Sequence, residues 1–380
     1  MSKSSIRRIN AVIKKEFKEI SRDKRTLFIL IFVPSFILFL FGFALNFDVR
    51  NISTGVLDQD KSQESREFIG LLERYNYFRI KCYVNSQEEI DNLINSDKVM
   101  VCLVIPPDFS RNILNSKQTE IQALISGTNS NTAGIIAGYV NAFVNNYGQS
   151  IRLPYFKKVG MKGDIIPLDY RPRVWYNSEL ESVKFLLPGL IGFILLISTV
   201  ISTALSVVRE REKKNIENII VSPIRSFEWI IGKLIPYLFV SLITATLVIT
   251  VGIVLFGIVI KGSIFWLFIA TLVYVTAGLG WGLLVSTVAE SQQVAFMVAM
   301  LSTLLPSLIL SGFVFPIESM PWIIQKITYI IPTRYFLIIL RGIILKGAGI
   351  LPYIDEFIYM CIFTVSVLIL SSVRLKKWRI

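Results

Sequence analysis

Long uncharged, apolar stretches alternate with short charged segments along this chain of 380 residues. Six stretches contain no charged residue: 26–47, 185–208, 234–260, 262–289, 291–317 and 357–373. The first five each exceed the roughly 20 apolar residues that an α-helix needs to cross a hydrocarbon core. The sixth reaches this length when Leu351–Ile354 extends it. The pattern predicts an α-helical polytopic membrane protein with six transmembrane helices.

The segment 1–26 precedes the first transmembrane helix, which we expect at 27–47. Apolar side chains recur in this segment every three or four residues, with basic side chains between them: Ile6, Ile9, Ile13, Phe17 and Ile20. This spacing predicts an amphipathic helix that lies in the interface of the cytoplasmic leaflet. A solvated basic tail would not need the apolar stripe.

Residues 48–183 are expected to form one inserted extracytoplasmic α/β domain. Runs rich in Val and Ile alternate there with helical patterns, and Ser86 with Glu89 three residues later has the spacing of a capping box. Such alternation favours a small α/β fold. The remaining segment, 184–380, then holds transmembrane helices 2–6.

The segment 318–346 is too apolar for an ordinary loop, yet charged residues interrupt it and two prolines break it. Irregular backbone at membrane depth is tolerated only when it packs against protein or water. We therefore expect a re-entrant pair of half-helices here.

The net charge of +13 is unevenly distributed. Residues 1–26 carry +6, the loop 209–233 carries +2 and the tail 374–380 carries +4, whereas 48–184 balances 16 basic against 16 acidic residues. Loops rich in Lys and Arg stay in the cytoplasm. Both termini are therefore expected inside, and the basic charge indicates membrane topology rather than nucleic-acid binding.

Composition excludes several function classes. The chain has no histidine and only three scattered cysteines, so the common catalytic triads and metal clusters are missing, and we expect no catalytic residue and no metal site. No G-x-x-x-x-G-K-[ST] motif is present to bind ATP phosphates. Gly278, Gly280 and Gly282 lie inside an apolar stretch, where close helix packing is their expected role.

The predicted spans also lack ionisable residues at mid-membrane, where ion-coupled carriers keep them. Any transport would then need an energy source outside this chain. An ion-coupled secondary transporter or channel remains the alternative, and a membrane-anchored receptor or an intramembrane enzyme fits the pattern less well.

The cytoplasmic loop 209–230 begins with alternating charges, Arg209 to Lys214, and continues with isoleucines on one helical face. One interpretation is a salt-bridged interfacial helix. The other is a docking helix whose apolar face enters a groove on a soluble partner.

The chain resembles the type-2 permease subunits of ATP-binding-cassette (ABC) exporters, in the subgroup with a large external domain after the first span. The resemblance extends over nearly the whole chain, in the order of the predicted spans. Its main motifs are Arg209-Glu210-Arg211-Glu212, Glu217, Ser222-Pro223-Ile224, Gly232-Lys233, Pro236-Tyr237, Phe315-Pro316, Met320-Pro321, Pro332-Thr333, Tyr335 and Arg341-Gly342. The family usually has Gly-Thr where this chain has Lys214-Asn215.

The resemblance implies two sets of site residues. Coupling to the ATPase subunit would use Glu210, Glu212, Ile216, Glu217, Ile219, Ile220 and Pro223. The re-entrant outer gate would use Pro316, Pro321, Pro332, Arg334, Tyr335 and Arg341.

The implied partners are an ABC nucleotide-binding ATPase subunit, which binds the ATP and Mg, and a second permease in a homo- or heterodimer. A periplasmic adaptor protein and membrane lipid are further candidate partners, and the chain itself would hold no cofactor. The expected location is the bacterial inner membrane.

Apolar and aromatic spans with hydroxyl groups, such as Ser198, Thr199, Ser202 and Thr203 on the second span, suit a drug-like or lipid-like cargo. The same hydroxyls equally suit helix–helix contacts.

Overall fold

The computed structural model describes residues 3–44, 51–75, 77–115, 117–158, 176, 182–213 and 224–377. The chain divides into two compact units. One unit comprises Met1–Asn46 with Arg173–Ile380, and the other is Phe47–Pro172.

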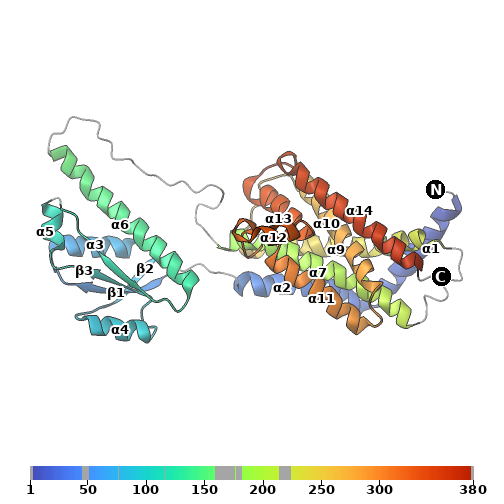
Figure 1. The fold of residues 1–380 in the computed structure, drawn as a ribbon, viewed down its shortest axis with the longest axis horizontal. Coiled ribbons are helices and arrows are strands. Elements are labelled where there is room, and N and C mark those ends of the chain that lie inside the picture. Colours follow the sequence, from blue (N-terminus) through green and yellow to red (C-terminus); the bar gives the residue numbers. More distant parts are fainter. Residues whose placement is uncertain are drawn as a thin grey trace. The chain divides into compact units, whose positions relative to one another are not determined.

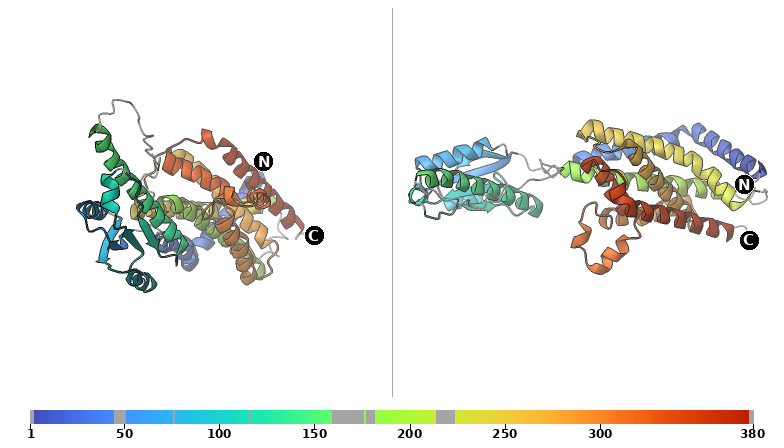
Figure 2. Two further views of the ribbon diagram at one scale, coloured as in Figure 1. Left: turned by 60° about the vertical axis from the view of Figure 1, so that its left-hand side comes forward. Right: turned by 90° about the horizontal axis from the view of Figure 1, so that it is seen from above.

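The first unit is a helical bundle, in which the long helices run side by side (Figures 1 and 2). Its long helices are α1 (Lys3–Arg22), α2 (Lys24–Ala44), α7 (Ser182–Glu212), α9 (Ser226–Phe256), α10 (Ile264–Ser286), α11 (Gln292–Ile309) and α14 (Ile354–Lys377). Six segments within the described residues are long and apolar enough to span a membrane: α2, α7, α9, α10, α11 and Leu351–Leu375. The predicted polytopic α-helical architecture is thereby confirmed.

Helix α2 begins at Lys24, slightly before the predicted start of the first span. The cause is Asp23, whose carboxylate accepts hydrogen bonds from the backbone amide of Thr26 at 3.1 Å and from its hydroxyl at 2.5 Å. These bonds cap the helix, since the first backbone N–H groups of a helix have no partner within it.

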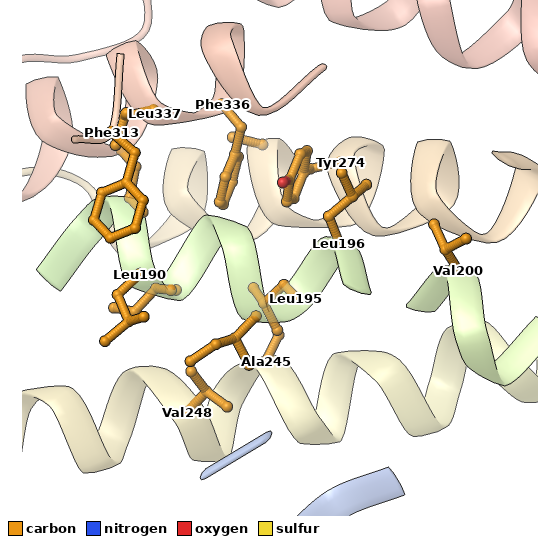
Figure 3. Packing of buried hydrophobic residues seen from close by; sticks show 14 of the residues in the cluster. Leu190, Leu195, Leu196, Val200, Ala245, Val248, Tyr274, Phe313, Phe336 and Leu337 are labelled. Carbon is orange, nitrogen blue, oxygen red and sulfur yellow. The ribbon is translucent and has the colours of Figure 1, made fainter. Parts of the chain in front are cut away.

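Helices α7 and α10 are the inner members of the bundle, because about two thirds of their spanning residues are buried. Leucine, valine and aromatic side chains pack around α7 (Figure 3). A methyl group on Gly278 would lie 2.1 Å from Thr199 Oγ1, and one on Gly282 would lie 2.5 Å from the carbonyl oxygen of Val200. The α7–α10 contact therefore requires glycine, which confirms the predicted packing role of these two residues.

Short helical segments follow α11: η1 (Ile317–Ser319), α12 (Trp322–Thr328), α13 (Pro332–Arg341), the π-helical turn η2 (Gly342–Lys346) and η3 (Leu351–Tyr353). The axis bends by 83° between α12 and the continuous pair α13–η2. A bent helical pair is the geometry expected of a re-entrant segment, whose insertion into the outer leaflet stays a prediction.

The second unit is an α/β fold with a four-stranded sheet in the order β2-β1-β3-β4. Its elements are β1 (Ile52–Asp58), α3 (Gln63–Arg74), β2 (Phe78–Tyr83), α4 (Gln87–Asn95), β3 (Val101–Ile105), α5 (Phe109–Leu114), β4 (Gln122–Ile125) and α6 (Ser130–Lys158). Strand β1 pairs in parallel with β2 and β3, and β4 is antiparallel to β3.

Two hydrophobic clusters cover the sheet of this unit. Phe68 of α3 and Phe143 of α6 belong to one cluster, and Ile90 of α4 belongs to the other. The Ser86 hydroxyl accepts from the Glu89 amide at 3.3 Å, as its spacing predicted, whereas the Glu89 carboxylate accepts from the amide of Asn85.

Candidate functional site

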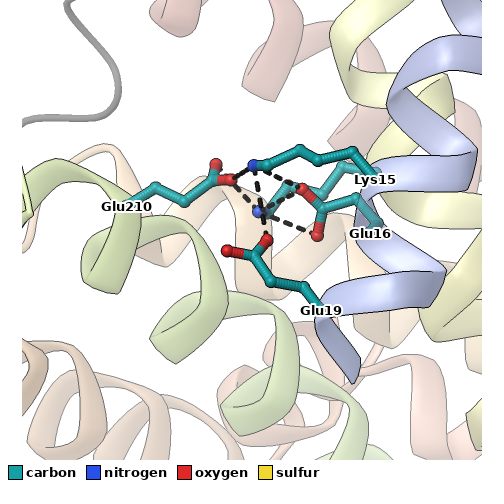
Figure 4. A network of polar contacts seen from close by, with 5 residues as sticks. Lys15, Glu16, Glu19 and Glu210 are labelled. Carbon is teal, nitrogen blue, oxygen red and sulfur yellow. Dashed lines mark hydrogen bonds and ion pairs between the residues drawn. The ribbon is translucent and has the colours of Figure 1, made fainter. Parts of the chain in front are cut away.

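A buried network of charges lies where α1, α7 and α9 meet (Figure 4). Lys233 Nζ of α9 is 2.9 Å from Glu210 Oε2 of α7 and 3.3 Å from Glu16 Oε1 of α1. Lys15 of α1 also pairs with Glu210, and its Nζ is 3.2 Å from Glu16 Oε1. Lys233 and Glu16 are each 1% exposed and Glu210 is 5% exposed. Three helices are thus joined by ion pairs away from water.

Two ammonium groups balance the two buried carboxylates, Glu16 and Glu210, and Lys15 also pairs with the exposed carboxylate of Glu19 at 3.4 Å. Burial raises the pKa of Glu16, because desolvation penalises its charged form. Burial alone would lower the pKa of Lys15, but the combined attraction of Glu210, Glu16 and Glu19 outweighs burial and the pKa is raised. Lys15 therefore remains cationic at neutral pH.

Carboxylate oxygens of Glu16, Glu19 and Glu210 lie within 4.8 Å of one another, a spacing that could hold a metal ion. Lys15 and Lys233 already supply positive charge to these carboxylates. An isolated buried charge is costly unless it is paired, and here the pairing is internal. The arrangement favours a structural ion network over a metal centre.

The other charged residues at the end of α7 reach two further elements. Arg209 Nη1 donates to Asp23 Oδ2 at 3.0 Å, and its Nε donates to Gln292 Oε1 at 3.3 Å. Arg211 donates to a backbone carbonyl in the turn between α10 and α11 at 3.1 Å. Glu212 accepts from the backbone amide of Gln292 at 2.8 Å. The last turn of α7 is therefore bonded to α9, to α1 and to Asp23, which is the residue after α1. It is also bonded to the turn between α10 and α11.

The two predicted coupling residues that the structure describes differ in their surroundings. Glu210 is buried in the network and Glu212 is exposed at the end of α7. The other predicted coupling residues lie outside the described part of the chain: Ile216, Glu217, Ile219, Ile220 and Pro223.

Sequence reasoning missed the roles of Lys15, Glu16 and Lys233. A signal was present for Glu16, which lies four residues after Val12 and four before Ile20, on the helix face that becomes buried. For Lys233 the sequence indicated burial more weakly: the residues before it form an apolar turn of α9 rather than a polar loop.

Three of the predicted gate residues, Pro332, Arg334 and Tyr335, lie at the bend between α12 and α13. Arg334 stacks 4.0 Å from the centre of the Tyr329 ring and donates a hydrogen bond to the Thr328 hydroxyl. Tyr335 donates from its hydroxyl to the Tyr329 carbonyl at 2.7 Å. Pro332 is the first residue of α13, where its missing N–H is not needed. These contacts fix the bend.

The two other predicted prolines precede short helices. Pro316 is the residue before η1, and Pro321 is the residue before α12. Both have an extended ψ, and their fixed φ predisposes the chain to a turn.

Arg341 connects three elements at the opposite end of α7 from the charge network. Its Nη1 donates to the Gly312 carbonyl at 3.1 Å, and its Nη2 donates to the Phe185 carbonyl at 3.3 Å. The guanidinium also stacks 3.9 Å from the centre of the Phe185 ring. Gly312 has a φ of 78°, which a residue with a side chain rarely adopts, so glycine allows this turn after α11. No carboxylate of the described residues pairs with Arg341.

A buried chain of hydroxyl groups joins α13 to the bundle. Tyr274 of α10 donates to the Gly192 carbonyl of α7 at 2.8 Å and lies 3.0 Å from the Thr333 hydroxyl. Ser307 of α11 contacts the same threonine at 3.0 Å. The Tyr274 ring stacks on the Phe336 ring (Figure 3), and the two ring centres are 4.0 Å apart. Each of these polar groups is satisfied within the bundle.

The predicted hydroxyls of α7 divide into two groups. Ser198 and Ser202 line a small recess of about 10 Å³ between α2, α7 and α9. Thr199 instead packs against Gly278 of α10. A volume of about 10 Å³ has room for about one water molecule, so the recess is not assigned to cargo. The contact of Thr199 with Gly278 supports a packing role for this residue.

Comparison with known proteins identifies the family. Residues 24–373 match the family model described as "ABC-2 family transporter protein". In Escherichia coli K12, the "Probable multidrug ABC transporter permease YbhR" is 33% identical over 345 residues, which cover 90% of this chain and 91% of YbhR. The similarly named YbhS is 32% identical over 344 residues, covering 90% of each chain. The "Inner membrane transport permease YhhJ" is 27% identical over 342 residues, covering 88% of each.

These matches confirm the resemblance inferred from the motifs. The matched region includes the six apolar helices, both ends of α7 and the bent pair α12–α13. The chain belongs to the ABC-2 transporter family and is a multi-pass permease subunit of an ABC transporter, a class of subunit that works with a separate ABC ATPase.

Proposed function

We propose that this chain is the permease half of an exporter for hydrophobic or amphipathic molecules, drug-like or lipid-like. The cargo leaves the cytoplasm or the inner leaflet, and ATP hydrolysis on the partner subunit powers the cycle. Two permease chains, identical or paralogous, form the translocation unit. The apolar spans and the names of YbhR and YbhS, both given as probable multidrug permeases, support this substrate class.

The polar junction at the last turn of α7 is the observation that carries the proposal. Four successive side chains, from Arg209 to Glu212, bond to different neighbouring elements. A force on the segment that follows α7 would therefore reach α1, α9 and the α10–α11 turn together. This is the arrangement that a permease needs if its power comes from a separate subunit.

Helix α7 can carry such a force across the membrane. It has 31 residues, which corresponds to about 46 Å at 1.5 Å per residue. One end holds Glu210 in the charge network, and the other presents Phe185 to Arg341. Movement at the inner end would thus change the contacts that close the outer end.

The segment containing Ile216, Ile219 and Pro223 is the proposed contact with the ATPase subunit. Both termini lie on the same cytoplasmic side in this proposal, and the α/β unit lies outside, where it can meet a periplasmic adaptor. Moving the bundle from mostly inward-facing to mostly outward-facing requires about 5.5 kcal/mol of differential binding from the ATPase.

Substitution of Ile219 by Asp tests the coupling. In vesicles containing the permease and its ATPase, we expect Ile219→Asp to insert normally but to lose cargo export per ATP hydrolysed. Leu114→Asp is a matched control, because Leu114 is 69% exposed on α5 of the other unit. Unchanged export per ATP in Ile219→Asp would reject the docking role.

Two arms of the same reconstitution test the rest of the proposal. Vesicles containing the permease alone should show no uphill export, and export without ATPase would favour the ion-coupled alternative.

Cysteines at the exposed positions Met100 and Lys213 should react with impermeant reagents from opposite sides of the membrane, Met100 from outside. Labelling from the reverse sides would overturn the orientation.

A further inference from the structure

Helix α1 presents three different faces along its length. Its buried face contains Ile9, Val12, Glu16 and Ile20, each less than a tenth exposed. This face packs on α9, where a methyl group on Gly232 would lie 2.7 Å from the Val12 side chain. The apolar stripe of α1 is therefore used mainly for protein packing, and the rest of its surface is open to other partners.

A strip of four cations runs along the exposed face of α1: Arg7, Lys14, Lys18 and Arg22. At 3.6 residues per turn these positions fall within about 80° of one another and extend over about 22 Å. None of the four forms an ion pair with a described residue, in contrast to Arg8 and Lys15 on the neighbouring face. The strip is a continuous positive surface without internal compensation.

An apolar edge lies beside this strip. Ile6 is 48% exposed and Phe17 is 37% exposed. The Phe17 ring lies 5.9 Å from the ring of Phe239, which is 55% exposed on the spanning helix α9. The apolar edge of α1 is therefore continuous with exposed apolar surface on the spanning helix α9.

We propose that the strip formed by Arg7, Lys14, Lys18 and Arg22 binds the headgroups of anionic phospholipids. A basic strip flanked by an apolar edge matches a membrane surface, where phosphate groups lie directly above acyl chains. An acidic protein surface would match the charge alone and would leave no lipid-facing role for Ile6 and Phe17. The proposal concerns lipid selectivity and does not depend on the cargo or on ATPase docking.

Lipid quenching in the full-length protein tests the proposal. Ala11 is exposed on the same face as the strip, so a bimane label on Ala11→Cys reports the neighbouring lipids. The three native cysteines, Cys82, Cys102 and Cys361, are replaced by Ser. Quenching of the bimane fluorescence is then measured in vesicles with brominated phosphatidylglycerol or brominated phosphatidylcholine.

We expect phosphatidylglycerol to associate near the label about fivefold to thirtyfold more strongly than phosphatidylcholine, since one or two basic side chains meet each headgroup. High salt should reduce this preference. Replacing all four strip residues by Gln should lower the ratio to about one. A matched variant carries Gln at four exposed basic positions of the α/β unit, Arg74, Arg79, Lys98 and Lys117, and should keep the preference.

A ratio near one in the parent protein would overturn the proposal, as would an unchanged ratio in the strip variant or an equal loss in the matched variant. A parent ratio near one, combined with loss of ATPase capture by the strip variant in lipid-free detergent, would assign the strip to the ATPase subunit instead.

Discussion

The charge network at the C-terminal end of α7 predicts an unusual pair of substitution effects. Replacing Lys233 by Met preserves much of the side-chain volume but removes the buried ammonium group between Glu16 and Glu210. Two buried carboxylates then share the single cation Lys15. Adding Glu16→Gln restores the balance, because one ammonium and one buried carboxylate remain, while Glu19 is exposed to solvent. The double variant should therefore be more stable than the single variant.

The magnitude follows from the burial of the three groups, which are 1% to 5% exposed. Removing one partner of a buried ion pair costs about 3–5 kcal/mol, because the remaining charge is unpaired. For a unit of this size, about 1 kcal/mol lowers the unfolding temperature by about 2–4 °C. Lys233→Met should thus unfold about 6–20 °C lower than the parent, and Glu16→Gln should recover most of that loss.

Thermal unfolding of the purified protein in detergent, followed by tryptophan fluorescence, measures the difference. Trp229 is a suitable reporter, since its ring centre lies 5.5 Å from Lys233 Nζ. Lys261→Met is the control, because Lys261 is exposed in the loop between α9 and α10. A double variant no more stable than Lys233→Met would refute the charge-balance argument. The same holds if Lys233→Met unfolds at the same temperature as the control Lys261→Met.

Two further substitutions test the rest of the site. Gly278→Ala inserts a methyl group 2.1 Å from Thr199 Oγ1 and should cost about 1–3 kcal/mol in thermal unfolding, whereas Gly70→Ala on α3 meets open space and should be neutral or slightly stabilising. Arg341→Gln removes the charged donor to two carbonyls, each bond worth about 1.5–3 kcal/mol, and should lower export more than ATP hydrolysis. An Arg341→Gln protein with parental export per ATP would contradict a role at the outer gate.

The spanning helices were predictable because their signal is local. Each apolar stretch is long enough to need a membrane, and charges mark its ends, so neither a partner nor a tertiary contact is required to recognise it. The bend at Pro332 was predictable for the same reason, since proline disfavours helical geometry in the residue before it. Helix ends were less certain: Asp23 moves the start of α2 by capping it.

The charge network was not predictable in the same way. Glu16 and Lys233 are 217 positions apart, and each looks like a solvated interfacial charge in its own segment. Only the packing of α1 along α9 brings them together. The same applies to Arg341, because its partners are backbone carbonyls, which no sequence pattern indicates.

The two ends of α7 are held by different kinds of bond, and this difference determines how the helix can move. The middle of α7 is fixed to α10 by glycine contacts that tolerate no sliding, since backbone and threonine atoms of α7 fill the space beside Gly278 and Gly282. Interfaces packed this closely move as units rather than deform. Side-chain ion pairs at the C-terminal end of α7 and guanidinium–carbonyl bonds at its N-terminal end can exchange partners without breaking a helix. We therefore expect α7 and α10 to move together as one rigid pair, with the conformational change taken up at Glu210 and Arg341.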